Sequence, residues 1–367
     1  MDLRHGADAP SSDAARSLAW TAEIEQSTHA IRRPWFRPRR QREYACGDRS
    51  AVVIGFRGAP LFVDPATESS LLVDPAEAPR VHSTARADVV IAGALRTNGQ
   101  LRFRSFYMKP ALSLAVQRRA GTEPSALMTG SRVQALVAGR TPFVVPRIVD
   151  SGHHGPRRAD WLLEEALAGA PITPDAHASA ALELLHQLPE VWKRFGAEHA
   201  ALDDEERSRA VTAFTALAQD PPDGTWPADL DRRALAGRVT ALLEDTRPMT
   251  TGVRHGDPGV GNLLRLEDGR LGLVDWEYAG HGHLAHDVMK VLLSAPDPAA
   301  LAASLPAPRL GAASHAMPWR RQVATAVVLF LRGWRYRRTK ALRRGSEAAN
   351  AHRMHRTLRT LAVLLDD

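Results

Sequence analysis

The sequence contains almost no cysteine. Cys46 is the single cysteine among 367 residues, which excludes an internal disulfide framework and any zinc site built from several cysteines. One cysteine in a chain of this length is typical of proteins from a reducing compartment. We therefore expect a cytoplasmic protein.

Long hydrophobic runs are missing as well. The longest apolar stretch, residues 323–331, is interrupted by Thr325 and is far shorter than the ~20 residues that span a bilayer. The first 16 residues contain acids and no apolar run, so we expect no secretory signal there. The sequence therefore favours no membrane partner.

Lysine is scarce although the chain is basic. The formal net charge is +7, yet only four of the 48 basic residues are lysines. Residues 319–360 hold twelve basic residues and one acid, so the positive charge belongs to the C-terminal end of the chain. A second arginine-rich run, residues 32–42, is typical of a solvated tail, and we expect no nucleic-acid partner. Any site that needs a lysine has few candidates.

Predicted strands and predicted helices occupy different parts of the chain. Within residues 101–109, Phe103, Ser105 and Tyr107 alternate with Arg104 and Phe106, which is the period of a strand. Strands are expected at 51–56, 60–63, 71–73, 88–95, 101–109, 143–150, 160–165, 263–266 and 271–275, with an Asn98-Gly99 turn between two of them. Helices are expected at 124–138, 176–188, 203–219, 232–244, 285–294, 320–341 and 345–365.

This order indicates an α+β fold class with two lobes. A chain of 367 residues is longer than one hydrophobic core usually organises. We expect a small β-rich N-lobe at residues 80–165 and a larger helical C-lobe at residues 166–367. Residues 1–79 are expected to form an N-terminal extension with some added strands.

Oxygen-bearing side chains gather on a glycine-rich stretch after residue 252. Asp257 precedes Asn262 by five residues, and Asp275 ends the second strand of a tight hairpin. The hairpin brings these side chains to one edge, where hard oxygen ligands suit Mg²⁺ together with substrate phosphates. Phosphoryl transfer uses such a set, because an aspartate accepts the proton of the attacking hydroxyl while an asparagine and a second aspartate hold Mg²⁺.

The same stretch resembles the aminoglycoside phosphotransferase and choline kinase-like family. The residues that carry the resemblance are His255-Gly256-Asp257, Asn262, Asp275-Trp276-Glu277, Ala279-Gly280-His281-Gly282 and Asp287. The resemblance covers about residues 80–365 and implies a bilobal protein-kinase-like fold, in which residues 80–165 would be the nucleotide-binding lobe.

The resemblance also implies roles for the matching residues of the C-lobe. Asp257 resembles the catalytic base, and His255 resembles the residue that supports the catalytic loop. Asn262 and Asp275 resemble the ligands of Mg²⁺, and Asp287 resembles the residue that braces the loop from the following helix.

In the N-lobe, the resemblance implies a nucleotide site for ATP or GTP. Lys109 resembles the lysine that contacts the α and β phosphates, and the backbone of Glu165, Ala166 and Leu167 resembles the hinge that meets adenine. The sequence departs from the family at two points. The helix after Lys109 contains no glutamate to pair with that lysine, the nearest acid being Glu123, and no glycine-rich phosphate loop is present.

The resemblance implies an ATP- and Mg²⁺-dependent O-phosphotransferase that phosphorylates a hydroxyl of a small molecule, in natural-product biosynthesis or antibiotic modification. Like charges 4 Å apart repel by roughly 4 kcal/mol at an effective dielectric near 20, so the basic C-terminal helices disfavour a polycationic aminoglycoside if they border the acceptor. Two alternatives stay open. One is a kinase that phosphorylates Ser/Thr of a precursor peptide, for example before dehydration in lanthipeptide-like biosynthesis, and the other is a catalytically inactive kinase-like binding module.

Overall fold

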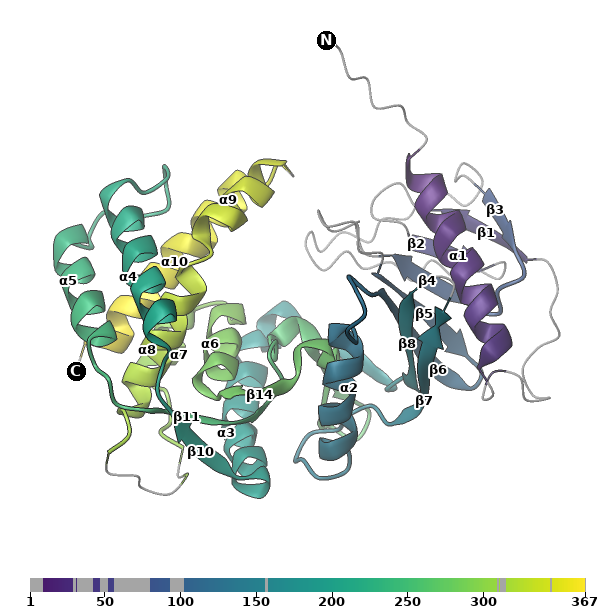
Figure 1. Ribbon diagram of the computed structural model, residues 1–367, viewed down its shortest axis with the longest axis horizontal. Coiled ribbons are helices and arrows are strands. Elements are labelled where there is room, and N and C mark those ends of the chain that lie inside the picture. Colours follow the sequence, from purple (N-terminus) through teal and green to yellow (C-terminus); the bar gives the residue numbers. More distant parts are fainter. Residues whose placement is uncertain are drawn as a thin grey trace, which may run out of the picture. The chain divides into compact units, whose positions relative to one another are not determined.

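The computed structural model describes residues 9–28, 31, 42–46, 52–55, 80–92, 102–155, 158–308, 310, 315–343 and 345–366 (Figure 1). The chain divides into two compact units. Unit 1 comprises the described residues of 1–138, 145–168 and 276–278, and unit 2 comprises those of 139–144, 169–275 and 279–367. The predicted strands at 60–63 and 71–73 and the predicted Asn98-Gly99 turn lie outside the described residues.

Unit 1 is built on one antiparallel sheet of eight strands. Its order is β3-β1-β2-β4-β5-β6-β8-β7. The strands are β1 (Arg42–Cys46), β2 (Val52–Gly55), β3 (Arg80–Ser83), β4 (Val89–Ala92), β5 (Arg102–Met108), β6 (Ala111–Arg118), β7 (Ile148–His154) and β8 (Ala159–Glu165). The region predicted as an N-terminal extension with some added strands supplies β1 and β2 to the same sheet that holds β4 to β8.

One face of this sheet is covered by helix α1 (Ala9–Ser27), drawn in purple across β1, β3 and β4 (Figure 1). Strand β5 shows the predicted alternation, because Phe103 and Tyr107 lie in the core beneath α1 and the Ser105 hydroxyl lies 2.9 Å from that of Thr21. The buried carboxylate of Glu25 accepts the backbone N–H of Arg86 at 2.8 and 2.9 Å. These bonds attach α1 to the segment between β3 and β4.

The opposite face carries helix α2 (Ala126–Val137), where Leu127 packs against Ala115 of β6 and Leu162 of β8. The short helix η5 (Trp276–Tyr278) also packs against α2. Gly130 makes this approach feasible, because a Cβ atom there would lie 2.0 Å from the carbonyl oxygen of Trp276.

Unit 2 consists of helices and two small sheets. The helices are η3 (Pro174–Ala176), α3 (His177–Phe195), α4 (Asp204–Gln219), α5 (Arg232–Leu243), η4 (Val260–Asn262), α6 (Ala285–Ser294), α7 (Pro298–Ala303), α8 (Trp319–Leu331), α9 (Trp334–Arg343) and α10 (Glu347–Leu365). One sheet has the order β10-β11-β14 (Ala197–Ala200, Met249–Arg254, Gly280–His283), and the other has β13-β12-β9 (Leu271–Leu273, Leu263–Leu266, Gly169–Pro171).

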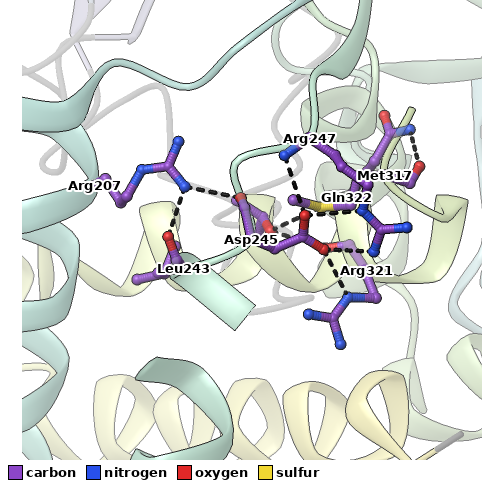
Figure 2. A network of polar contacts seen from close by, with 8 residues as sticks. Arg207, Leu243, Asp245, Arg247, Met317, Arg321 and Gln322 are labelled. Carbon is purple, nitrogen blue, oxygen red and sulfur yellow. Dashed lines mark hydrogen bonds and ion pairs between the residues drawn. The ribbon is translucent and has the colours of Figure 1, made fainter. Parts of the chain in front are cut away.

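Figure 2 shows a polar network around Asp245 in unit 2. The side chain of Asp245 is 10% exposed and accepts bonds from Arg247 at 2.9 and 2.6 Å, while Arg321 of α8 lies 3.3 Å away. Arg207 of α4 donates to the carbonyl oxygens of Leu243 and Asp245 at 2.6 and 2.8 Å. The network thus fixes the segment that leads from α5 into β11.

The predicted α+β class, with a β-rich N-lobe and a helical C-lobe, is confirmed. Two helix predictions are corrected. Helix α3 continues through Pro189 to Phe195, since the buried Val191 and Trp192 keep its apolar face in the core although proline removes one helical hydrogen bond. The predicted helix 320–341 is two helices, because the chain breaks at Gly333, a residue of low helix propensity. Within the described residues, no helix is long and apolar enough to cross a membrane.

Candidate active site

The predicted catalytic loop lies between β11 and β12 and is held by Asp287. The buried carboxylate of Asp287 accepts the N–H of His255 at 2.7 Å and that of Gly256 at 2.8 Å. Gly256 has φ of +87°, a conformation that glycine adopts without strain. The main chain of the loop therefore turns around one side chain of α6.

His255 is a buried structural residue of this loop. Its ring Nε2 lies 3.1 Å from the carbonyl oxygen of Val274, and its Nδ1 accepts the N–H of Asp257 at 3.2 Å. Burial lowers the pKa of His255, although Asp287 opposes this shift. A neutral ring with its proton on Nε2 satisfies both bonds, so the position of Asp257 depends on His255.

Three side chains of helix α6 contact the predicted catalytic loop. Asp287, Lys290 and Ser294 have the spacing i, i+3, i+7, which places them on one helix face. Lys290 Nζ lies 2.9 Å from Oδ1 of Asp257, and the Ser294 hydroxyl accepts the N–H of Val260 at 3.0 Å. Sequence reasoning missed the contact of Lys290 with Asp257, although the predicted helix 285–294 and the scarcity of lysine both pointed to this residue.

Asn262 and Asp275 are linked to the same loop. The amide nitrogen of Asn262, the last residue of η4, donates to the carbonyl oxygen of Asp257 at 2.8 Å. The backbone N–H of Val274 donates to the carbonyl oxygen of Asn262 at 3.0 Å, so Asp275 follows directly after a residue bonded to Asn262. Asp275 has φ of +67°, and the chain passes from unit 2 to unit 1 at the bond that follows it.

Asn262 and Asp275 fit a magnesium site in which the phosphates of a nucleotide supply further ligands. Among the described residues, no group of three or more His, Cys, Asp or Glu side chains could hold a metal ion. Mg²⁺ is commonly bound by one or two protein oxygens, while waters and substrate phosphates supply its remaining ligands. An amide oxygen and a carboxylate match that chemistry.

The predicted nucleotide residues lie in unit 1. Lys109 is exposed in the turn between β5 and β6, and not on a strand. In the predicted hinge, Glu165 N–H donates to Arg147 O at 2.9 Å and Ala166 N–H donates to Ala111 O at 3.0 Å. Leu167 N–H donates no such bond within the part of the chain that the structure describes.

The predicted catalytic loop lies in a segment of the chain that matches the model of a known protein family. Residues 109–321, more than half of the chain, match the model of the phosphotransferase enzyme family. The matched segment begins at Lys109 and includes Asp257, Asn262, Asp275 and Asp287. No curated protein matches the sequence.

Several solved structures resemble the chain at low identity. The macrolide 2′-phosphotransferase MphH from Brachybacterium faecium is 17% identical with a TM-score of 0.42, covering 72% of this chain and 91% of that chain. A choline/ethanolamine kinase family protein from Mesorhizobium loti is 16% identical with a TM-score of 0.42, covering 75% and 92%. The GDP and kanamycin complex of APH(2″)-IIia is 12% identical with a TM-score of 0.47, covering 73% and 92%.

Proposed function

Because this chain belongs to the phosphotransferase enzyme family, we propose that it is a kinase that uses ATP or GTP with Mg²⁺ to phosphorylate a hydroxyl group of a small molecule. The observation that carries the proposal is the catalytic loop, in which Asp287 holds the main chain and Asn262 is bonded to the carbonyl of Asp257. This set of contacts orients one carboxylate and one amide oxygen at a single loop. Natural-product biosynthesis or antibiotic modification is the proposed setting.

The proposed reaction is an in-line displacement at the γ-phosphorus. Asp257 orients the acceptor hydroxyl and takes its proton, while the oxygen forms a bond to phosphorus. The bond from phosphorus to the β–γ bridging oxygen breaks, and the nucleoside diphosphate leaves with the electron pair. Asn262 and Asp275 would hold Mg²⁺, which supplies charge neutralisation to the phosphates when it is bound.

Lys290 supports the proposal as a positioning residue for Asp257. Its ion pair with Asp257 is partly solvated, since the two side chains are 29% and 39% exposed. Such pairs contribute only about 0–1 kcal/mol to stability, so removal of Lys290 should leave the fold intact. The ammonium group fixes the rotamer of the carboxylate that meets the acceptor.

The charge near Asp257 supports a neutral or anionic acceptor. Lys290 Nζ lies 5.9 Å from the ring centroid of Phe330, and the guanidinium carbon of Arg337 lies 3.9 Å from the same centroid. Burial and, as a smaller cause, the charge of the neighbouring Arg353 together lower the pKa of Arg337 to about 10. A polycationic acceptor would meet repulsion here, whereas a carboxylate or phosphate group would relieve it.

Calorimetric titration of Mg·ATP tests the nucleotide site. We expect the wild-type protein to bind in a magnesium-dependent manner, and Asp275→Asn to weaken binding at least about tenfold, because charge-assisted contacts are the strong ones. The matched control is Asp268→Asn, which changes an exposed turn residue paired with Arg270 at 2.7 Å. Absence of binding by the wild type would contradict the kinase and favour a kinase-like binding module.

Transfer of labelled γ-phosphate tests the acceptor. Matched hydroxyl compounds that differ in charge would be compared: glycerol, D-glycerate, choline and kanamycin, together with Ser/Thr peptides. We expect transfer to neutral or anionic small molecules. Efficient phosphorylation of kanamycin would contradict the proposed acceptor class, and labelling of the peptides alone would favour a peptide kinase.

A further inference from the structure

An almost buried ion pair lies on the face of the unit 1 sheet that carries α2. Arg104 of β5 donates through Nη1 to Oε1 of Glu164 on β8, and through the same nitrogen to the hydroxyl of Ser113 at 3.0 Å. The Glu164 side chain is 4% exposed, and that of Arg104 is 23% exposed. The carboxylate is therefore shielded, while the guanidinium reaches solvent.

Helix α2 is part of the same cluster. Gln134 Nε2 donates to Oε2 of Glu164 at 2.6 Å and to the carbonyl oxygen of Pro146 at 3.0 Å. Both oxygens of Glu164 are thus bonded, one to Arg104 and the other to Gln134. The cluster joins three strands and the helix within unit 1.

Kinases place a cation at this position in the fold. In protein kinases a lysine on the strand before the first helix pairs with an acid and contacts the phosphates. Here the strand before α2 is β6, with the sequence Ala-Leu-Ser-Leu-Ala-Val-Gln-Arg, and it contains no lysine. On its α2 face it carries Ser113, Ala115 and Gln117, none of which is charged.

Strand pairing places Arg104 of β5 beside the part of β6 where a kinase would have its lysine. Arg104 lies directly opposite Ala115 in the β5–β6 register. Ala115 has only a methyl side chain, so the guanidinium can extend across β6 to Glu164. Lys109, five residues later, lies in the exposed turn that follows β5.

We propose that Arg104, oriented by Glu164, is the residue that binds the nucleotide phosphates, in place of Lys109. This inference rests on the proposed kinase function. A guanidinium carries five N–H donors in a planar fork, so a bond to Glu164 is compatible with contacts to phosphate oxygens. Arg104 also lies outside the segment that matches the family model, which begins at residue 109.

The test separates phosphate binding from adenine binding. Calorimetry would measure the affinities of Mg·ATP and of adenosine for the wild type, Arg104→Gln, Lys109→Gln and Arg118→Gln. Arg118 is an exposed arginine at the end of β6 and serves as the matched control. We expect Arg104→Gln to lose at least about tenfold in affinity for Mg·ATP and less than about twofold for adenosine, and Lys109→Gln and Arg118→Gln to lose less than about twofold for both.

Each outcome has a defined meaning. The role of Arg104 would be overturned if Arg104→Gln kept its affinity for Mg·ATP, or if it lost affinity for Mg·ATP and adenosine equally. It would also be overturned if Lys109→Gln lost more affinity for Mg·ATP than Arg104→Gln. A wild type that binds no Mg·ATP would instead contradict the proposed function itself. Because Arg104→Gln leaves Glu164 without its cation, the double variant Arg104→Gln/Glu164→Gln repeats the test without a buried unpaired charge, and Arg104→Lys is expected to retain most of the affinity.

Discussion

The predicted catalytic loop of unit 2 and the α2-facing side of the sheet in unit 1 are built in different ways. In the loop, side chains bind main-chain groups: Asp287 holds two N–H groups, and Asn262 binds a carbonyl five residues away. On the sheet, side chains bind one another across strands, and Arg104 and Glu164 are 60 residues apart in sequence.

This difference explains why one region is visible as a motif and the other is not. A bond from a side chain to the main chain ties a residue type to a fixed position along the chain. A cross-strand pair needs only that two side chains share a face, so the cation can come from β5 as well as from β6. The motif His255-Gly256-Asp257 therefore identifies the loop, whereas no local spacing identifies Arg104.

The largest effect is expected for Asp257→Ala. If this carboxylate acts only on the acceptor, kcat should fall by about a thousandfold, while the affinity for Mg·ATP should change less than about twofold. Steady-state kinetics with an accepted hydroxyl compound and calorimetry with Mg·ATP would measure the two quantities. Asp297→Ala, at the N-cap of α7, is the control, and a parallel loss of binding and turnover in Asp257→Ala would refute its assignment to the acceptor.

The next effect is expected for Asp287→Ala. This variant leaves the N–H groups of His255 and Gly256 buried without their acceptor, and each unsatisfied group costs about 1–3 kcal/mol. We expect the free energy of unfolding to fall by about 3 kcal/mol, measured by urea denaturation. The control Asp297→Ala removes one exposed N-cap bond of 3.0 Å, with an expected cost of about 1 kcal/mol. Equal losses in the two variants would mean that the loop does not depend on its main-chain bonds.

A smaller effect is expected for Lys290→Met. Removal of the ammonium group frees the rotamer of Asp257, so kcat should fall about tenfold while the KM for Mg·ATP stays within about twofold. Lys290→Arg should recover part of the turnover, because it restores a cation near Asp257. Lys193→Met is the control, since Lys193 forms an exposed pair with Glu190 on α3. An unchanged kcat in Lys290→Met would show that the Asp257 carboxylate needs no partner.

The predictable parts of the fold are those with a strong period. The predicted helix 285–294 coincides with α6, and the alternation along β5 is confirmed. Strand β6 was not predicted, for two reasons. Its Ala and Ser residues have low β-propensity. Six of its eight residues are buried, so both faces of the strand lie in the core and the sequence shows no alternation of polar and apolar residues.

The candidate site divides in the same way. The roles proposed for Asp257, Asn262, Asp275 and Asp287 came from one contiguous stretch of sequence. In the structure, hydrogen bonds within unit 2 join Asp287 to His255, and join Asp257 to both His255 and Asn262. The pairing between Glu164 and Gln134 could not be predicted, because it depends on the register of β8 and on the packing of α2 against it. Tertiary context decides which strand supplies a side chain.

The smallest effect concerns Asp245, whose partners are both local and distant. Arg247 lies two residues away and Arg321 comes from α8, and the hydrogen bond from Arg247, opposed by burial, is the main cause that lowers the pKa of Asp245 to about 2. A carboxyl group with a lowered pKa in the folded state contributes stability above its unfolded pKa, near 3.9, and loses it as the pH falls towards 2. After allowance for solvent screening, Asp245→Asn should lower the free energy of unfolding by about 1 kcal/mol at pH 7. The difference from the wild type should shrink between pH 4 and about pH 2, as measured by urea denaturation across this range. Asp268→Asn, in an exposed turn, should show a smaller difference, and a pH-independent effect of Asp245→Asn would assign the contribution of Asp245 to packing and not to its charge.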